Sequence, residues 1–211
     1  MTGARMSKGD ATRQRLLDAA QRSILEKGFT ATSIDELIAE CGLTKGGFFY
    51  HFKDKNDLAK ALLRRYIAED EEVYDRIFSQ ARDLVDDPLQ VFLLGLKLLA
   101  DVMGDMPNGH PGCMVAVSTY YERMFDRELR DINTEAALQW RRRFRAILDE
   151  IGTRYRPREP VDLDELADLV SSVLEGGIVM AKALHDPVSL KRQILTFRAM
   201  VQALFVRIPE G

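Results

Sequence analysis

The chain has 211 residues, of which 46% are hydrophobic and 30% charged, and its formal net charge is −3. This composition is typical of a globular protein and excludes a disordered or collagen-like chain. No apolar run approaches the ~20 residues that span a bilayer, and the N-terminus lacks the apolar core of a signal peptide, so we expect a cytoplasmic protein with no membrane partner.

The cysteine and histidine content excludes several kinds of site. The two cysteines, Cys41 and Cys113, lie far apart in the sequence, and the chain has only three histidines. Neither a disulfide framework nor a metal site is supported, and we expect no cofactor. Residues 1–55 carry nine Lys or Arg and seven Asp or Glu. This mild basic bias is compatible with a few phosphate contacts, but it is not evidence for nucleic-acid binding by itself.

The N-terminal segment leads into the first predicted helix. Residues 1–9 are small or polar without periodicity and indicate a flexible, solvated arm. Asp10 or Thr12 can cap the helix that follows, and Gly28 ends it. The apolar stripe of this helix consists of Leu16, Leu17, Ala20, Ile24 and Leu25.

The second predicted helix is short. Thr32 or Ser33 can cap it, and Glu36 stands three residues beyond Ser33, the spacing of a capping box. Apolar residues recur at helical spacing up to Ile38, and the helix stops at Cys41-Gly42, where glycine tolerates the positive φ of a helix end. We expect the thiol of Cys41 to be buried and inert.

A third helix is predicted to begin directly after this turn. Thr44 can cap a helix that runs from Lys45 to about His51, and two short helices joined by a tight turn form a helix-turn-helix. Its first turn contains Gly46 and Gly47, which each cost about 1 kcal/mol relative to alanine. Small side chains there let the backbone approach base edges and phosphates in the major groove. Lys45 beside them can donate to a guanine edge or a phosphate.

The end of this helix is densely aromatic. Phe48 and Phe52 lie four residues apart, and we expect both to pack inward. Tyr50 and His51 point elsewhere and can donate to phosphate oxygens. Taken singly, each of these residues is more simply explained as core or surface.

The segment TKGGFFYHFKDKNDL resembles the recognition-helix signature of the tetracycline-repressor (TetR) family of transcriptional regulators, and the resemblance covers about residues 11–62. It implies that Lys45 and Gly46 meet bases or backbone, that Tyr50 and His51 hold phosphates, and that Lys55 meets a phosphate from the start of the next helix. Thr32 stands where the family often contacts a phosphate, although a plain helix cap explains it equally well. Phe49 replaces the commoner tyrosine. The candidate DNA-binding residues are Thr32, Thr44, Lys45, Gly46, Gly47, Phe49, Tyr50, His51 and Lys55.

The pattern after the helix-turn-helix is helical to the end of the chain. A helix over about 54–81 would be about 40 Å long and could join two domains rigidly. A nearly continuous apolar helix follows over 91–103, and 104–112 is the most loop-like segment. Further helices are expected from Cys113 to Phe125 and over 126–151, before a proline- and arginine-rich break at 155–160.

The last two predicted helices span 162–185 and 187–207, and both are strongly apolar. Packed against their own copies across a two-fold axis, they would form a four-helix bundle, as in the dimers of the TetR family. The adjacent glycines Gly176 and Gly177 favour this homodimer over the alternative, in which the pair only closes the core of one subunit.

The middle helices carry the thioethers and aromatic rings of a mostly apolar ligand pocket, although core packing explains the same residues. Cys113 follows Pro111-Gly112 at a predicted helix start, where the helix dipole lowers the pKa of a thiol, and the segment resembles a Gly-Cys motif of family members that respond to electrophiles. A buried, unreactive cysteine is the alternative. The candidate ligand or sensor residues are Met103, Cys113, Tyr120, Tyr121, Met124 and Trp140.

Together these features predict an all-α protein of about nine helices, with a DNA-binding domain over 1–54 and a ligand-binding and dimerisation domain over 55–211. The predicted function is a homodimeric repressor that binds double-stranded operator DNA and is released by a small-molecule inducer, including a thiol-reactive one. Activation of transcription through the same contacts is a variant. The alternatives are a helical interaction protein without DNA affinity and an enzyme, and the sequence offers no triad, metal cluster or phosphate loop for the latter.

Overall fold

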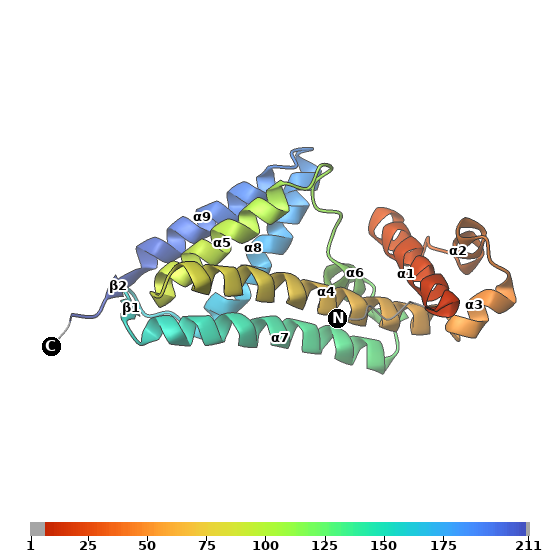
Figure 1. Ribbon diagram of the computed structural model, residues 1–211, viewed down its shortest axis with the longest axis horizontal. Helices are drawn as coiled ribbons and strands as arrows, with labels where there is room; N and C mark the ends of the chain where they lie inside the picture. The colour runs from red at the N-terminus through yellow and green to blue at the C-terminus, as the bar shows by residue number, and fades with distance from the viewer. Residues whose placement is uncertain (1–6, 210–211) are drawn as a thin grey trace. The chain divides into compact units, whose positions relative to one another are not determined.

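The computed structural model describes residues 7–209. Within these residues the regular secondary structure is helical apart from two three-residue strands, which confirms the predicted all-α class (Figure 1). None of the described helices is both long enough and apolar enough to cross a membrane. The helices are α1 (Lys8–Lys27), α2 (Ile34–Cys41), α3 (Lys45–His51), α4 (Lys55–Leu84), α5 (Pro88–Gly104), α6 (Met114–Tyr120), the 3-10 helix η1 (Glu122–Met124), α7 (Arg127–Gly152), α8 (Leu163–Ala183) and α9 (Ser189–Leu204).

The chain divides into two compact units. The first contains the residues up to Ala68 together with Gly112–Thr134, and the second contains Glu69–Pro111 together with the residues from Glu135 onward. The sequence placed the boundary between residues 54 and 55, at the start of α4. The division instead falls inside α4 and inside α7, so both helices contribute residues to both units.

In the first unit, α1 begins earlier than the sequence predicted. Ser7 is its N-cap and accepts a hydrogen bond from the backbone N–H of Asp10 at 3.0 Å. The expected caps, Asp10 and Thr12, therefore both lie inside the helix. Residues 1–6 of the predicted arm lie outside the described residues, and the last two residues of that arm are helical.

The helix-turn-helix itself follows the predicted local signals. Ser33 and Glu36 form the capping box of α2, and Gly42 ends that helix with a φ of 64°. Thr44 caps α3 by accepting from the backbone N–H of Gly47 at 3.1 Å. These predictions are confirmed because each depends only on residues within one turn of the chain.

In the second unit, α9 packs along α5 and α8 (Figure 1). The approach of α8 to α9 is close at Gly177, where an added Cβ would lie 2.7 Å from Cδ1 of Leu190 and 3.3 Å from its Cα. Asp87 caps α5, with Pro88 at the first helical position. Tyr155 donates a hydrogen bond to the same Asp87 carboxylate at 2.9 Å.

Two features of the second half of the chain differ from expectation. The helix expected from Cys113 to Phe125 ends at Tyr120, and η1 replaces its last turn. The break expected at 155–160 contains the strand β1 (Tyr155–Pro157), which pairs antiparallel with β2 (Phe205–Arg207). Strands of three residues carry no readable alternation, so this pairing depends on contacts between distant segments of the chain.

Candidate nucleic-acid interface

The aromatic run of α3 is divided between the core and the surface. Phe48 and Phe52 are fully buried, as predicted, whereas Phe49 is 52% exposed and Tyr50 is 82% exposed. A large aromatic side chain this exposed has little packing to gain from its position. Tyr50 therefore presents both a ring and a phenolic hydroxyl to whatever approaches α3. His51 is half-buried, and its ring meets that of Tyr50 edge-on, with centroids 4.9 Å apart.

The first turn of α3 has room for side chains that it lacks. A Cβ added at Gly46 would meet only the hydroxyl of Thr44, at 3.8 Å. A Cβ added at Gly47 would meet side-chain atoms of Thr44 and Leu43 at 3.6 Å or more, which is ordinary contact. Packing within the chain therefore does not require either glycine. Packing therefore does not explain why two poor helix formers stand in the first turn of α3.

Lys45 stands at the open end of this turn. Its ammonium lies 3.2 Å from the Asp35 carboxylate of α2, and both side chains are about three-quarters exposed. An ion pair this exposed contributes little stability and exchanges readily for another anion. Lys45 is therefore held beside the first turn of α3 and remains available to a phosphate or a base edge.

Two residues that were predicted to contact phosphates instead make hydrogen bonds within the chain. Thr32 is 1% exposed and donates its hydroxyl hydrogen to the carbonyl of Gly28, so its position corrects the prediction of a surface contact. Lys55 donates to the carbonyl of Phe29, and its ammonium lies 4.3 Å from the centroid of the Phe29 ring. Partial burial lowers the pKa of Lys55, with Glu36 acting in the opposite direction. Both residues stabilise the segment between α1 and α2, and Lys55 would have to leave the Phe29 carbonyl to reach a phosphate.

The sequence analysis missed two cations near the end of α3. Lys53 lies two residues beyond the end of this helix, is exposed, and has no ion-pair partner among the described residues. The guanidinium of Arg13, on α1, lies 5.1 Å from the centroid of the Phe52 ring. The motif HFKDK contains Lys53, so its position after the aromatic run could have suggested it. Nothing local to Arg13 indicates that α1 comes so near.

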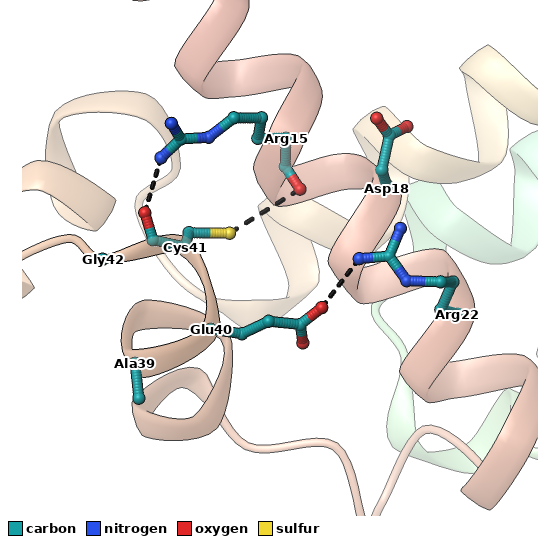
Figure 2. A pocket seen from close by; sticks show the side chains of 7 residues that line it. All are labelled: Arg15, Asp18, Arg22, Ala39, Glu40, Cys41 and Gly42. Atoms are coloured by element: carbon teal, nitrogen blue, oxygen red, sulfur yellow. Dashed lines mark hydrogen bonds and ion pairs between the residues drawn. The ribbon is translucent and has the colours of Figure 1, made fainter.

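A polar groove of about 490 Å³ lies between α1 and α2 (Figure 2). The Arg15 guanidinium donates to the carbonyl of Cys41, and the Cys41 thiol lies 3.7 Å from the carbonyl of Arg15. Arg22 pairs with Glu40 at 2.7 Å along the same groove. Cys41 is half-buried rather than buried as predicted, and desolvation raises the pKa of its thiol. These contacts therefore join α1 to the end of α2, and the raised pKa keeps the Cys41 thiol in its protonated, unreactive form.

The six candidate sensor residues are divided between the two units. Tyr120 is 77% exposed, and Met124 is 51% exposed, with its sulfur 3.4 Å from the Thr30 hydroxyl. The Tyr121 hydroxyl lies against Gly28, 2.8 Å from where a Cβ would stand. These three residues and Cys113 belong to the first unit, whereas Met103 and Trp140 belong to the second.

Comparison with known proteins addresses the helix-turn-helix most directly. Residues 16–62 match the family described as bacterial regulatory proteins, tetR family. The HTH-type transcriptional regulator AcrR of Shigella flexneri is 44% identical over 57 residues, which cover 26% of each chain.

Similarity also extends over nearly the whole chain at lower identity. The uncharacterised HTH-type transcriptional regulator YxaF of Bacillus subtilis is 24% identical over 185 residues, 87% of this chain and 91% of its own. The crystal structure of a TetR transcriptional regulator from Chloroflexus aurantiacus superposes with a TM-score of 0.76 at 22% identity, covering 96% of this chain and 99% of its own. The fold of both units is therefore that of known regulators.

Proposed function

We propose that this chain, a transcriptional regulator that belongs to the TetR family, represses transcription by binding operator DNA as a homodimer and is released by a small molecule. The family consists of regulators rather than enzymes. The first turn of α3 carries the proposal, because its two glycines have no packing partner that excludes a side chain. The proposal implies a cytoplasmic location, where operator DNA lies.

The proposed contacts follow from exposure and charge. Lys45 and the glycine backbone would approach base edges, and the Tyr50 hydroxyl would donate to a phosphate. Phe49 would offer only apolar contact, for example to a thymine methyl group. Lys53 adds an exposed cation at the other end of α3. Lys55 and His51 would join them only after a rearrangement of their present contacts.

The anisotropy of a labelled DNA fragment from upstream of the protein's own gene tests DNA binding. We expect the logarithm of the affinity to fall linearly with the logarithm of salt concentration, because bound phosphates release counterions. Lys45→Ala should weaken binding about tenfold or more, whereas Arg142→Ala should leave it unchanged. Arg142 is a matched control, since it is also exposed and ion-paired, with Glu135. Failure to bind any fragment after a random-sequence selection would contradict the proposal.

The proposed dimer uses α8 and α9, the helices predicted over 162–185 and 187–207. Each has one face packed within the subunit and a second, exposed stripe of small or apolar residues at helical spacing. Gly177 is explained by its contact with Leu190, but Gly176 has no neighbouring atom within 4 Å of an added Cβ. A partner backbone would explain Gly176. The exposed stripes are Leu169, Ser172, Gly176, Val179 and Ala183 on α8, and Thr196, Ala199, Met200 and Ala203 on α9.

Sedimentation tests this interface. We expect the wild-type protein and Leu138→Arg to sediment as dimers at micromolar concentration, because Leu138 lies on α7, outside the proposed interface. Gly176→Arg should weaken the dimer by about a hundredfold or more, since a charged side chain would separate the helices. A wild-type monomer at this concentration would contradict the dimer.

Release by the inducer is proposed to be a population shift. Two recognition helices must be spaced to enter successive major grooves, about 34 Å apart. A ligand changes that spacing only if it binds one state of the dimer more tightly than the other. The helix α4, which contributes residues to both units, is the proposed mechanical link.

A thiol-reactive inducer would act at Cys113, the half-exposed N-cap residue of α6. The test is best made in a Cys41→Ser background, where Cys113 is the one remaining cysteine. Alkylation should abolish DNA binding in that background and have no effect when Cys113→Ser is added. Equal insensitivity of both proteins would end the thiol hypothesis and leave reversible ligands.

A further inference from the structure

An acidic residue occupies a core position in the part of α4 that belongs to the second unit. Asp70 is followed on the same helical face by Tyr74, Ile77 and Ala81, at spacings of four, seven and eleven residues. These three side chains are 7%, 2% and 0% exposed. Asp70 itself is half-buried. A carboxylate therefore stands where the helix otherwise carries only residues that pack inward.

No cation compensates this carboxylate. Asp70 makes no hydrogen bond or ion pair in the described part of the chain. Burial, together with the negative charges of Glu71 and Glu69, raises its pKa from 3.8 to about 7. A group this strongly desolvated and unpaired is a common mark of a binding site.

The basic side chain of α7 that pairs with this stretch of α4 is already neutralised. Arg143 of α7 pairs with Glu71 and, at 2.7 Å, with Asp75. Its guanidinium lies 5.8 Å from the centroid of the Tyr74 ring. The second carboxylate oxygen of Glu71, Oε1, is buried and has no hydrogen-bond partner. The surroundings of Asp70 therefore carry excess negative charge.

The packing of α4 against α7 brings the single tryptophan of the chain to the same level. The two helices run in the same direction, since Glu71 pairs with Arg143 and Arg82 pairs with Glu150 further along both. The Phe144 ring lies 5.5 Å from that of Tyr74, centroid to centroid. One turn earlier on each helix, four residues back, stand Trp140 and Asp70.

Trp140 is itself incompletely satisfied. Its side chain is 8% exposed, and its indole Nε1–H is buried without an acceptor. Buried indole N–H groups ordinarily find a partner, so the Trp140 ring is not held in place by a hydrogen bond of its own. The indole face is also the strongest aromatic acceptor for a cation.

We propose that Asp70 and Trp140 recognise an apolar organic cation, so that the inducer of this regulator belongs to the class of quaternary or delocalised lipophilic cations. This inference rests on the proposed function, which supplies the role of the ligand. The carboxylate provides the opposite charge, and the indole provides a face that attracts a cation without strongly hydrating it. An anionic ligand of the same size is excluded by the excess negative charge.

The pair tetraphenylphosphonium and tetraphenylborate tests the class, because the two ions have the same shape and opposite charge. Trp140 is the only tryptophan, so its fluorescence in the full-length protein reports on this site alone. We expect tetraphenylphosphonium to change that fluorescence saturably in the micromolar range and to bind at least about a hundredfold more tightly than tetraphenylborate. No binding of the phosphonium up to about 1 mM, or tighter binding of the borate, would overturn the proposal.

Two variants locate the charge that matters. Asp70→Asn preserves shape and removes the charge, and it should weaken phosphonium binding about tenfold or more. Asp75→Asn makes the same change one turn away at a side chain that is 70% exposed, and it should alter binding less than about twofold. Equal effects of the two substitutions, or no effect of Asp70→Asn, would overturn the assignment to Asp70.

The same titrations, repeated on the complex with operator DNA, separate this inference from the proposed function. Fluorescence change with release of DNA supports both. Fluorescence change without release supports the cation site and contradicts its role as the inducer site. If the ligand-free protein binds no DNA, the proposed repressor function is contradicted. The fluorescence titration then still tests the cation site by itself.

Discussion

The first turn of α3 and the middle of α8 both contain adjacent glycines, and the two pairs differ in what surrounds them. Gly177 has a side chain and a backbone of α9 against it, so a methyl group there would clash with Leu190. Gly46, Gly47 and Gly176 have no such neighbour. A glycine that the chain's own packing requires needs no further explanation, whereas the other three stand on surfaces where we propose DNA or a second subunit.

Asp70 extends the same comparison from glycines to charges. Arg143, Glu71 and Asp75 compensate one another within the second unit, as buried or half-buried charges ordinarily do. Asp70 has no such compensation. These glycines and Asp70 lower the stability of the chain without a compensating contact inside it. They are therefore the residues for which we propose contact with DNA, a second subunit or a ligand.

The largest expected effect distinguishes the glycines of α8. Gly177→Leu should lower the free energy of unfolding by about 3 kcal/mol, because the side chain must displace Leu190 and part of α9. Gly176→Ala should instead leave it unchanged or raise it by up to about 1 kcal/mol. Urea denaturation at one fixed protein concentration measures both. Equal destabilisation would remove the distinction between a packed and an open glycine.

Asp70→Asn should stabilise the protein in a pH-dependent way. The carboxyl releases its proton near pH 3.8 when unfolded and near pH 7 when folded, so the folded state binds more protons between these values. The free energy of unfolding therefore falls by up to about 4 kcal/mol as pH rises from about 4 to about 7. Asp70→Asn should remove this pH dependence and gain about 2 kcal/mol at pH 8, because the amide that replaces the carboxylate keeps part of the cost of burial.

His110 contributes a slope of the opposite sign to the pH dependence of the free energy of unfolding. Burial and the charge of Lys182 lower its pKa from 6.5 to about 4, so its contribution to the free energy of unfolding rises with pH over this window. Because the two windows overlap and the slopes have opposite signs, thermal or urea denaturation across pH 4–8 should show little net change in the wild type and a clear rise in Asp70→Asn. A variant that follows the wild-type curve would show that Asp70 is not desolvated.

The smallest expected effect concerns the surface of α3. Tyr50→Phe should weaken DNA binding by about 1 kcal/mol, because it removes one phosphate hydrogen bond. The loss should be the same for operator and unrelated DNA, since phosphate contacts carry no sequence information. Competition titrations against both DNAs measure it. A loss confined to the operator would make Tyr50 a base contact.

The sequence predicted the features that depend on neighbouring residues. The capping box of Ser33 and Glu36, the cap at Thr44 and the positive φ at Gly42 were all readable, because each is satisfied within one helical turn. The position of Thr32 was not, since its burial depends on how the segment after α1 folds back on Gly28 and Ser23.

Asp70 was missed for a different reason. It stands in the run AEDEEVYD, which looks like a solvated acidic face. Only the spacing to Tyr74, Ile77 and Ala81 places it on the inner face of α4, and that spacing could have identified it. The position of Trp140 opposite Asp70 depends on how α4 and α7 pack together, so it could not be predicted from the sequence of either helix.

The most direct test of the account compares stability and DNA affinity in Gly46→Ala. The substitution has room for its methyl group and replaces a poor helix former, so we expect the free energy of unfolding to rise by up to about 1 kcal/mol. We expect the same protein to bind the upstream DNA fragment at least about tenfold more weakly in the anisotropy assay, because the methyl group holds α3 away from the DNA. A variant that is more stable and binds DNA as tightly as the wild type would contradict the central claim that α3 keeps its glycines for DNA.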